Sequence, residues 1–347
     1  MVDIIEICTY NLIKTKGGAN MAVKDDVLAI FEQNKGVYLS GEQLAEQLSV
    51  SRNSIWKAVK TLQETGYQIT AVTNKGYCLA EANDILSTQS LEKHFVAPHP
   101  FSWEIHKTLH STNDALRIKA QQGAKDGLVI ISDTQTGGKG RLGRTFHSPG
   151  GGTGIYMSLL LRPTIVADEA LFITTSAAVA VAKAIETITG QVAEIKWVND
   201  IFCRKQKVCG ILTEASFNLE GRHLEYAILG IGINVQEPTN GFPSDLSSIA
   251  GGVLESGQTV LEVRSKLVVQ ILNNFWEYYQ NLSQKSFLQE YRTRSLIIGQ
   301  DIWVLNENGS IKAKAISITD NCELEVKYEN GTKEILSAGE ISIRPVL

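Results

Sequence analysis

The run from Gly137 to Arg144, Gly-Gly-Lys-Gly-Arg-Leu-Gly-Arg, is the feature that most constrains this chain. Its four glycines permit close backbone approach, and its three cationic side chains can donate hydrogen bonds to an anion. It is not a Gly-Lys-Ser/Thr phosphate loop, because the chain continues through Thr145 and Phe146 to the apolar run 155–161, which is typical of a strand. Taken alone, the run is equally compatible with a flexible charged surface loop or an RNA-binding loop.

Length and composition indicate several ordinary globular domains. The chain has 347 residues, of which 43% are hydrophobic and 20% are charged, so two or three domains are expected. The formal net charge of −4 argues against a protein that coats nucleic acid with its whole surface. Any contact with DNA must therefore come from a locally basic face.

The cysteines and the hydrophobic runs bear on the cellular compartment. No two of the five cysteines form a Cys-x-x-Cys pair, so neither a zinc site nor a disulfide framework is expected. No run of 18 apolar residues occurs, and the first twenty residues lack the features of a secretory signal. We expect a cytoplasmic protein without a membrane partner.

Residues 1–21 require an explanation of their own. The sequence Lys16-Gly17-Gly18, shortly before Met21, is what a translated ribosome-binding site would encode. We therefore expect residues 1–21 to be either a non-native extension or a disordered arm.

Residues 22–84 predict a winged helix-turn-helix DNA-binding domain. Three helical stretches carry apolar stripes, and a hairpin of strands 68–72 and 76–79 follows them. The third helix combines an apolar face with a polar, basic face, as a recognition helix requires. A helical protein-interaction module with a solvated basic face is the alternative. The residues expected to contact DNA, or to cap the helices that do, are Ser40, Ser51, Arg52, Asn53, Ser54, Lys57, Lys60 and Lys75.

Residues 85–296 predict a mixed α/β domain, and residues 297–347 a small β domain. The central pattern gives strands at 129–132 and 226–234, helices at 170–188 and 263–282, and a hairpin of two strands, 195–200 and 207–214. After residue 300, short apolar runs alternate with turn residues, which favours an SH3-like barrel or a comparable sandwich.

Five ordered motifs give the central domain a resemblance. They are Ser-Thr-Asn at 111–113, the glycine-rich loop 135–144, Lys-Trp-Val-Asn-Asp at 196–200, Lys-Val-Cys-Gly-Ile-Leu at 207–212, and Gly-Ile-Gly-Ile-Asn at 230–234. In this order they resemble biotin protein ligase. Together with the flanking domains, they resemble the bifunctional class, which is both biotin-[acetyl-CoA-carboxylase] ligase and biotin operon repressor.

The resemblance implies a class II synthetase-like α+β central domain and a two-step reaction. Biotin and ATP, with Mg²⁺, give biotinyl-5′-AMP and pyrophosphate, and a lysine of the biotin carboxyl carrier protein of acetyl-CoA carboxylase then receives the biotin. Cations are needed because a carboxylate meets a polyanion and charge builds on phosphorus. Accumulated biotinyl-5′-AMP would order the glycine-rich loop, favour a homodimer and so favour operator DNA binding.

The resemblance also implies roles for individual residues. Lys207 and Arg141 are the expected catalytic residues, and Asp200 the expected Mg²⁺ ligand. The residues expected to bind biotin are Ser111, Thr112, Asn113, Gln135, Lys139, Gly140, Arg141, Lys207, Gly210, Gly230 and Gly232. The residues expected to bind ATP or the adenylate are Arg141, Arg144, Phe146, Asn199, Lys207 and Asn234.

Three positions depart from the family pattern. Lys139 stands where an arginine is common, Phe146 where a tryptophan often packs on adenine, and Val198 where a proline is common. Lysine keeps the charge but loses the bidentate fork, and phenylalanine keeps stacking with less area. Two other readings stay open: a lipoate-type cofactor transferase, and a biotin-sensing regulator without turnover.

Overall fold

The computed structural model describes residues 19–96, 98–166, 169–218, 223–306, 309–337 and 342–345. The expected N-terminal extension lies outside these ranges up to residue 18, and residues 19–21 begin the first helix. Contacts divide the chain into two compact units, one ending at Asn83 and the other beginning at Asp84. Each unit is described by itself.

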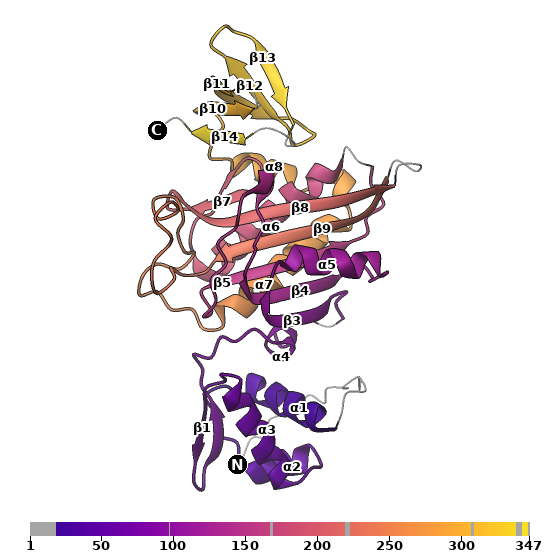
Figure 1. Cartoon of the computed structure of the whole chain (residues 1–347), viewed down its shortest axis with the longest axis vertical. Helices are drawn as coiled ribbons and strands as arrows, with labels where there is room; N and C mark the ends of the chain where they lie inside the picture. The colour runs from indigo at the N-terminus through magenta and orange to yellow at the C-terminus, as the bar shows by residue number, and fades with distance from the viewer. Residues whose placement is uncertain are drawn as a thin grey trace, which may run out of the picture. The chain divides into compact units, whose positions relative to one another are not determined.

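The first unit is a winged helix-turn-helix, which confirms the prediction (Figure 1). Its core contains Val27, Phe31, Leu44, Ile55 and Leu62, each at most 3% exposed. The two wing strands pair antiparallel around a turn at residues 73–75. The elements are α1 Ala19–Gln33, α2 Gly41–Gln47, α3 Arg52–Glu64, β1 Ile69–Val72 and β2 Gly76–Leu79.

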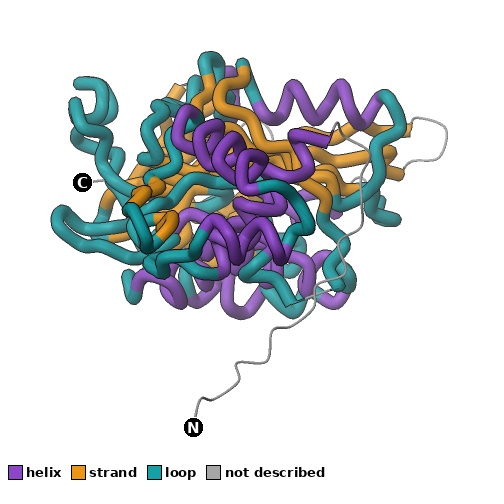
Figure 2. Tube along the Cα trace, turned by 90° about the horizontal axis from the view of Figure 1, so that it is seen from below, coloured by secondary structure: helices purple, strands orange, loops and turns teal. Residues whose placement is uncertain are grey.

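The second unit contains a seven-stranded sheet with the order β3-β4-β5-β9-β8-β7-β6. β3 and β4 run parallel, and the other neighbours run antiparallel. Residues 219–222, which connect the long β8–β9 hairpin, lie outside the described ranges and are grey in Figure 1 and Figure 2. The strands are β3 Ser102–Leu109, β4 Leu128–Gln135, β5 Gly154–Leu161, β6 Glu194–Lys196, β7 Asp200–Cys203, β8 Gln206–Asn218 and β9 His223–Asn234.

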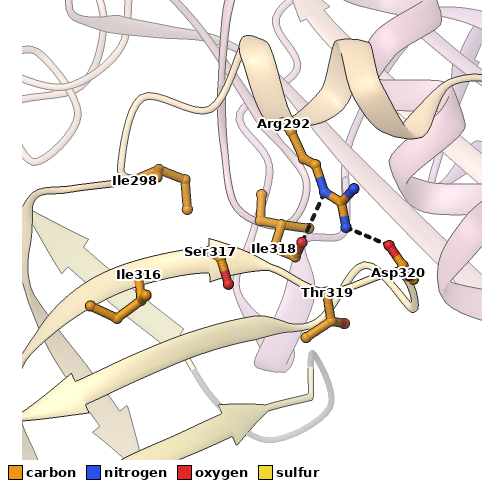
Figure 3. Close-up of a pocket in the computed structure, with 7 residues that line it drawn as sticks. All are labelled: Arg292, Ile298, Ile316, Ser317, Ile318, Thr319 and Asp320. Atoms are coloured by element: carbon orange, nitrogen blue, oxygen red, sulfur yellow. Dashed lines mark hydrogen bonds and ion pairs between the residues drawn. The ribbon is translucent and has the colours of Figure 1, made fainter.

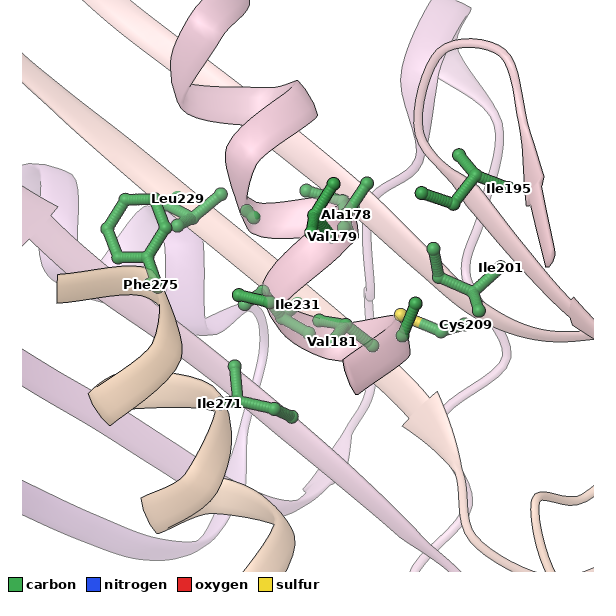
Figure 4. Packing of buried hydrophobic residues seen from close by; sticks show 14 of the residues in the cluster. Ala178, Val179, Val181, Ile195, Ile201, Cys209, Leu229, Ile231, Ile271 and Phe275 are labelled. Carbon is green, nitrogen blue, oxygen red and sulfur yellow. The ribbon is translucent and has the colours of Figure 1, made fainter. Parts of the chain in front are cut away.

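Helices cover the two faces of this sheet unequally. α6 and α7 pack together on one face and bury the main hydrophobic core with alternate residues of β5, β8 and β9 (Figure 4). α5 packs on β4, β5 and β9 over a smaller apolar cluster formed by the intervening residues. Much of the α5 face is therefore left uncovered by helices. The helices are α4 Thr88–Glu92, α5 Thr112–Gln121, α6 Ala170–Thr189, α7 Val263–Tyr279 and α8 Leu288–Thr293, with 3-10 turns at Arg141–Gly143 and Leu282–Gln284.

α6 is long and apolar enough to cross a membrane by composition alone. It has 20 residues, and an 18-residue stretch of it has a mean hydropathy of 1.5, but 72% of that stretch is buried inside the protein. Its apolar composition is explained by packing between the sheet and α7, since a helix that is hydrophobic on all sides belongs in a core.

The predicted hairpin of strands 195–200 and 207–214 was wrong in its first half. The structure has a short strand β6, a turn at residues 197–199, and a separate strand β7 that pairs with β8. Trp197 and Val198 are buried at 4% and 1% exposure although they lie in the turn. Their apolar character, which resembled a continuing strand, comes from packing under the sheet end.

The C-terminal part forms a five-stranded antiparallel sheet with the order β13-β12-β11-β10-β14, as expected of a small β domain. Trp197 Nε1 donates a hydrogen bond to Cys322 O at 3.0 Å, which attaches this sheet to the turn after β6. Its strands are β10 Asp301–Asn306, β11 Gly309–Ile318, β12 Leu324–Tyr328, β13 Lys333–Leu336 and β14 Ser342–Pro345.

Candidate functional site

Three glycines form a flat surface, here called the glycine floor, on the α5 face of the sheet. Gly210 pairs with Gly232, and Gly230 lies two residues before Gly232 on β9, so strand alternation puts all three on one face. A Cβ on Gly230 would lie 2.3 Å from Asn113 Oδ1, and one on Gly232 would lie 2.5 Å from the Phe146 ring. Only glycine leaves space for the side chains that lie above these positions.

A group of polar side chains, all buried except the half-buried Gln135, borders the floor beside Gly230. Ser111 caps α5, which places Thr112 and Asn113 in its first turn. Gln135 Oε1 accepts hydrogen bonds from Thr112 N at 2.8 Å and Thr112 Oγ1 at 3.1 Å. Ser158 Oγ donates to Asn113 Oδ1 at 2.6 Å. Thr112, Asn113, Gln135 and Ser158 are called the polar ring below.

Sequence reasoning missed Ser158 and Glu214. Ser158 is fully buried, and Glu214 Oε2 accepts a hydrogen bond from Asn113 Nδ2 at 2.7 Å. Strand alternation could have found both. Ser158 on β5 pairs with Gly230 on β9, and Glu214 on β8 lies two residues beyond Leu212, which also pairs with Gly230. A lone serine within an otherwise apolar strand was the available signal.

A cationic group lies at the other end of the glycine floor, beside Gly210. A Cβ on Gly210 would lie 3.5 Å from Lys207 Cε, and Lys207 Nζ is 2.6 Å from Asp200 Oδ1. Arg141 Nη1 donates to Asn199 Oδ1 at 3.2 Å. Burial lowers the pKa of the Arg141 guanidinium; the nearby Asp200 carboxylate opposes this shift. The structure thus brings together the residues expected to be catalytic.

The glycine-rich loop folds back on itself between these groups. Gly140 N donates to Arg144 O at 2.7 Å, and Phe146 N donates to Gly138 O at 2.9 Å. Leu142 has a φ of 55°, a left-handed conformation uncommon for leucine. Arg144 is exposed at the loop surface.

Lys139, expected to contact biotin, is engaged with α5. Its Nζ is 2.5 Å from Asp114 Oδ1, and Arg117 also pairs with Asp114 at 2.7 Å. Burial alone would raise the pKa of Asp114, but its hydrogen bond and charge interaction with Lys139, together with Arg117, hold that pKa below its ordinary value. In this structure Lys139 therefore anchors the loop to α5.

Phe146 lies on the glycine floor between the polar ring and Lys207. Its ring atoms would meet Cβ atoms placed on both Gly210 and Gly232, and its centroid is 6.4 Å from that of Tyr156. The ring therefore adjoins the space between the two ends of the site, as well as the loop that carries Arg144.

The expected metal position has one carboxylate. No group of three or more His, Cys, Asp or Glu residues that could hold a metal occurs among the described residues. Asp200 is the carboxylate beside Lys207, and Asn234 lies on the same sheet face as Gly232, at the end of β9. A cation here would need most of its oxygen ligands from a substrate.

A buried arginine, also missed, lies behind the site at the start of α7. Arg264 is 4% exposed; its Nη1 is 3.0 Å from Asp133 Oδ1 and its Nε is 3.4 Å from Asp84 Oδ2. Nη2 also donates to Asp84 O. Asp133 precedes Gln135 on β4, so Arg264 connects the first residue of this unit to a strand of the polar ring.

A pocket of about 480 Å³ lies elsewhere, between α8 and the C-terminal sheet (Figure 3). Arg292 Nε donates to Ile318 O at 2.9 Å and Nη2 to Asp320 Oδ1 at 2.7 Å, so the guanidinium fastens the two elements together. The pocket contains no residue predicted for the site. Its lining residues are Arg292, Ile298, Ile316, Ser317, Ile318, Thr319 and Asp320.

In the first unit, the residues predicted to contact DNA lie on α3, at the helix caps and in the wing. Ser40 accepts from Gln43 N, and Ser51 accepts from Ser54 N, so both serines are N-caps. Lys75, in the wing turn, lies 5.9 Å from the Tyr38 ring centroid. Of the α3 residues predicted to contact DNA, Ser54 is half-buried, and the structure leaves exposed Arg52, Asn53, Lys57 and Lys60.

Comparisons with known proteins match all three regions of the chain. Residues 24–78 match the HTH domain family, residues 106–234 the biotin/lipoate A/B protein ligase family, and residues 297–344 the biotin protein ligase C terminal domain. These ranges contain the winged helix, the glycine floor with the polar ring, and the small C-terminal sheet.

Two curated relatives and one solved structure extend the likeness. The bifunctional ligase/repressor BirA of Bacillus subtilis (strain 168) is 32% identical over 328 residues, covering 91% of this chain and 97% of the relative. The bifunctional ligase/repressor BirA of Escherichia coli (strain K12) is 27% identical, covering 71% of this chain and 79% of the relative. Biotin protein ligase from Aquifex aeolicus, in complex with biotin and ATP, has a TM-score of 0.58 and 26% identity, covering 70% of this chain and 99% of the other.

Proposed function

This chain belongs to the family of bifunctional biotin ligase/repressors, and from this we propose that the glycine floor is the site where biotin is activated by ATP. The protein is a biotin-[acetyl-CoA-carboxylase] ligase with a DNA-binding repressor domain. The observation that carries the site assignment is the polar ring at one end of the floor and Lys207 at the other.

The polar ring suits the ureido group of biotin. That group offers one carbonyl acceptor and two N–H donors, and the Asn113, Thr112 and Ser158 side chains supply both donors and acceptors. All three are at most 4% exposed, so a ligand that displaces their hydrogen bonds within the protein must itself offer matching groups. The ring sulfur and alkyl chain of biotin then lie beside Asn113 and the Phe146 ring, the side chains that cover Gly230 and Gly232.

The other end of the floor suits the carboxylate and the phosphates. Lys207 offers a positive charge where the biotin carboxylate approaches the α-phosphate, and Arg141 adds a second charge beside Asn199. The carboxylate attacks phosphorus directly, so no protein base is needed, and pyrophosphate leaves. These cations stabilise the charge that develops in this step. Arg144, which is exposed on the loop, contacts the ATP phosphates as a third cation. Asn234 contacts the nucleotide.

Mg²⁺ fits the site only as a companion of ATP. Asp200, the carboxylate beside Lys207, would hold it together with phosphate oxygens of ATP and water. The Asp200–Lys207 ion pair holds the lysine in place. When bound, Mg²⁺ supplies neutralisation of phosphate charge.

The second step and the repressor role involve partners. Biotinyl-5′-AMP passes its biotinyl group to a lysine of the biotin carboxyl carrier protein, and the adenylate-bound protein forms a homodimer that binds operator DNA with its two winged helices. Both take place in the cytoplasm. Sedimentation with biotin and ATP tests the dimer: a species that stays monomeric at micromolar concentration, while the adenylate is bound, contradicts it.

Pyrophosphate release tests the enzyme. We expect release that depends on biotin and ATP, followed by biotin labelling of an added carrier domain. Lys207→Ala should lower the rate about 100-fold or more, as loss of a charge-stabilising donor does. The matched control is Lys119→Ala, because Lys119 pairs with Glu104 at the same distance of 2.6 Å but lies away from the floor.

Three outcomes would change the assignment. Equal loss in both lysine variants would contradict the role of Lys207. Faster turnover with lipoate than with biotin would indicate a lipoate-type transferase. Biotin binding without any pyrophosphate release from folded protein would leave a biotin-sensing regulator.

A further inference from the structure

The outer face of α3 carries an exposed tryptophan among polar and cationic residues. Asn53, Trp56, Lys57 and Lys60 follow the spacing i, i+3, i+4, i+7 and so share one face of the helix. The opposite face, which includes Ile55, is buried in the domain. Trp56 is nevertheless 50% exposed.

A single exposed apolar residue is ordinary on a protein surface. The residues around Trp56 therefore decide whether it belongs to a binding surface and for what kind of partner. Lys60 Nζ lies 5.4 Å from the centroid of the Trp56 ring, within the range of a cation–π interaction. Lys57 and Arg52 are exposed on the same helix. An apolar protein partner covering Trp56 would have to desolvate these cations, whereas a polyanion would pair with them.

The position of Trp56 in the fold indicates which part of a nucleic acid it would contact. α3 is the second helix of the helix-turn-helix, and Trp56 lies in its second turn, following the Ser51 cap. In this motif, residues in the first half of the recognition helix reach base edges in the major groove. The C5 methyl of thymine is the apolar group that the four bases present there.

We propose that Trp56 packs against a thymine methyl group in the operator and contributes sequence specificity. The inference rests on the proposed repressor function. Lys60 holds the indole ring from one side and leaves other ring atoms exposed for the base. Asn53 and Arg52, one turn earlier, supply the polar contacts that accompany it.

A base contact and a phosphate contact differ in salt dependence. Trp56 is neutral, so Trp56→Ala should weaken operator binding about tenfold without changing the slope of affinity against salt. Lys57→Ala should lower that slope by about one unit, because it removes one released counterion.

The test uses the full-length protein with biotin and ATP. A duplex is first enriched from a random-sequence library, and each thymine in it is then replaced by uracil, which lacks the methyl group. We expect one or more positions per half-site where this replacement weakens binding of the original protein severalfold. At those positions Trp56→Ala should be insensitive, whereas Lys57→Ala should respond like the original protein. Phe217→Ala, which removes a 44% exposed aromatic ring from β8, is the matched control.

Equal sensitivity to uracil in the original protein and in Trp56→Ala, at every position, overturns the inference. If no duplex is enriched, the repressor function itself fails and the inference fails with it. Thermal melting by circular dichroism identifies misfolding of Trp56→Ala. In that case Trp56→Gln, which places a helix-favouring side chain without a ring at this exposed position, is carried through the same uracil series: the sensitivity to uracil must be lost, and unchanged sensitivity counts against the proposal.

Discussion

Adding one methyl group at Gly230 should damage the site without straining the backbone. Unlike many glycines of this chain, Gly230 does not have a positive φ. Its added Cβ would lie 2.3 Å from Asn113 Oδ1 and 3.0 Å from Asn113 Cγ. The Asn113 amide must therefore move by about 1 Å to regain an ordinary contact distance of at least ~3.5 Å.

That movement breaks two hydrogen bonds of Asn113, one to Ser158 of the polar ring and one to Glu214. Asn113 accepts from Ser158 and donates to Glu214, at 2.6 and 2.7 Å. Each bond contributes about 1 kcal/mol, so the ring loses about 2 kcal/mol of the organisation that a ligand requires. This corresponds to about 30-fold weaker biotin binding. Any direct bond from Asn113 to biotin would add to the loss.

Isothermal titration calorimetry with biotin measures the effect of Gly230→Ala. Gly41→Ala is the control, because Gly41 also lacks a positive φ and its added Cβ would meet only the Tyr77 ring, at 3.4 Å. Thermal unfolding of both variants separates loss of the fold from loss of the site. Unchanged biotin affinity in a folded Gly230→Ala protein would refute the assignment of the polar ring to biotin.

Three further predictions concern the rest of the second unit. Arg264→Met should lower the free energy of unfolding by about 3 kcal/mol, because two carboxylates lose a buried partner. Urea unfolding measures this loss. A loss below about 1 kcal/mol, the size expected for an exposed ion pair, would contradict the prediction. The pKa of Glu186 lies below its ordinary value of 4.5, mainly through its hydrogen bonds with Arg294. This pair should therefore stabilise the fold above pH 4.5 and lose its effect as the pH falls through the lower folded-state pKa. Glu186→Gln should reduce the fall in the free energy of unfolding as the pH drops below 4.5. An unaltered dependence of stability on pH would count against the Glu186–Arg294 pair. Burial raises the pKa of Cys203 to about 11 and that of Cys209 further. Both thiols should resist alkylation at neutral pH in native protein, as mass spectrometry can check, and rapid labelling would disprove their burial.

Much of the local structure could be predicted from periodicity and capping. The wing strands, β5, β9 and α6 were recognisable because their residues follow a strict period or a continuous apolar run. Ser40 and Ser51 were recognisable as N-caps, since a serine before an amphipathic stretch supplies the acceptor that a helix start needs. The turn at residues 197–199 was not, because its apolar residues pack into the core.

The parts of the site were predictable to different degrees. Lys207, Asp200 and Arg141 were singled out because they lie in the ordered motifs that resemble biotin protein ligase. Ser158 and Arg264 did not, because a buried polar residue is recognisable only when its partners are known. Trp56 was not among the residues predicted to contact DNA, and only the structure shows that half of its side chain is exposed.

The sequence by itself determined the order of the three domains, the winged helix and the ligase motifs, since these depend on local periodicity, caps and glycine spacing. The tertiary structure alone decided which side chains meet across the sheet. It placed Asn113 over Gly230, Phe146 over Gly232 and Lys139 against Asp114. Such contacts join residues far apart in the chain, and they depend on strand register and on packing geometry, neither of which a single sequence expresses.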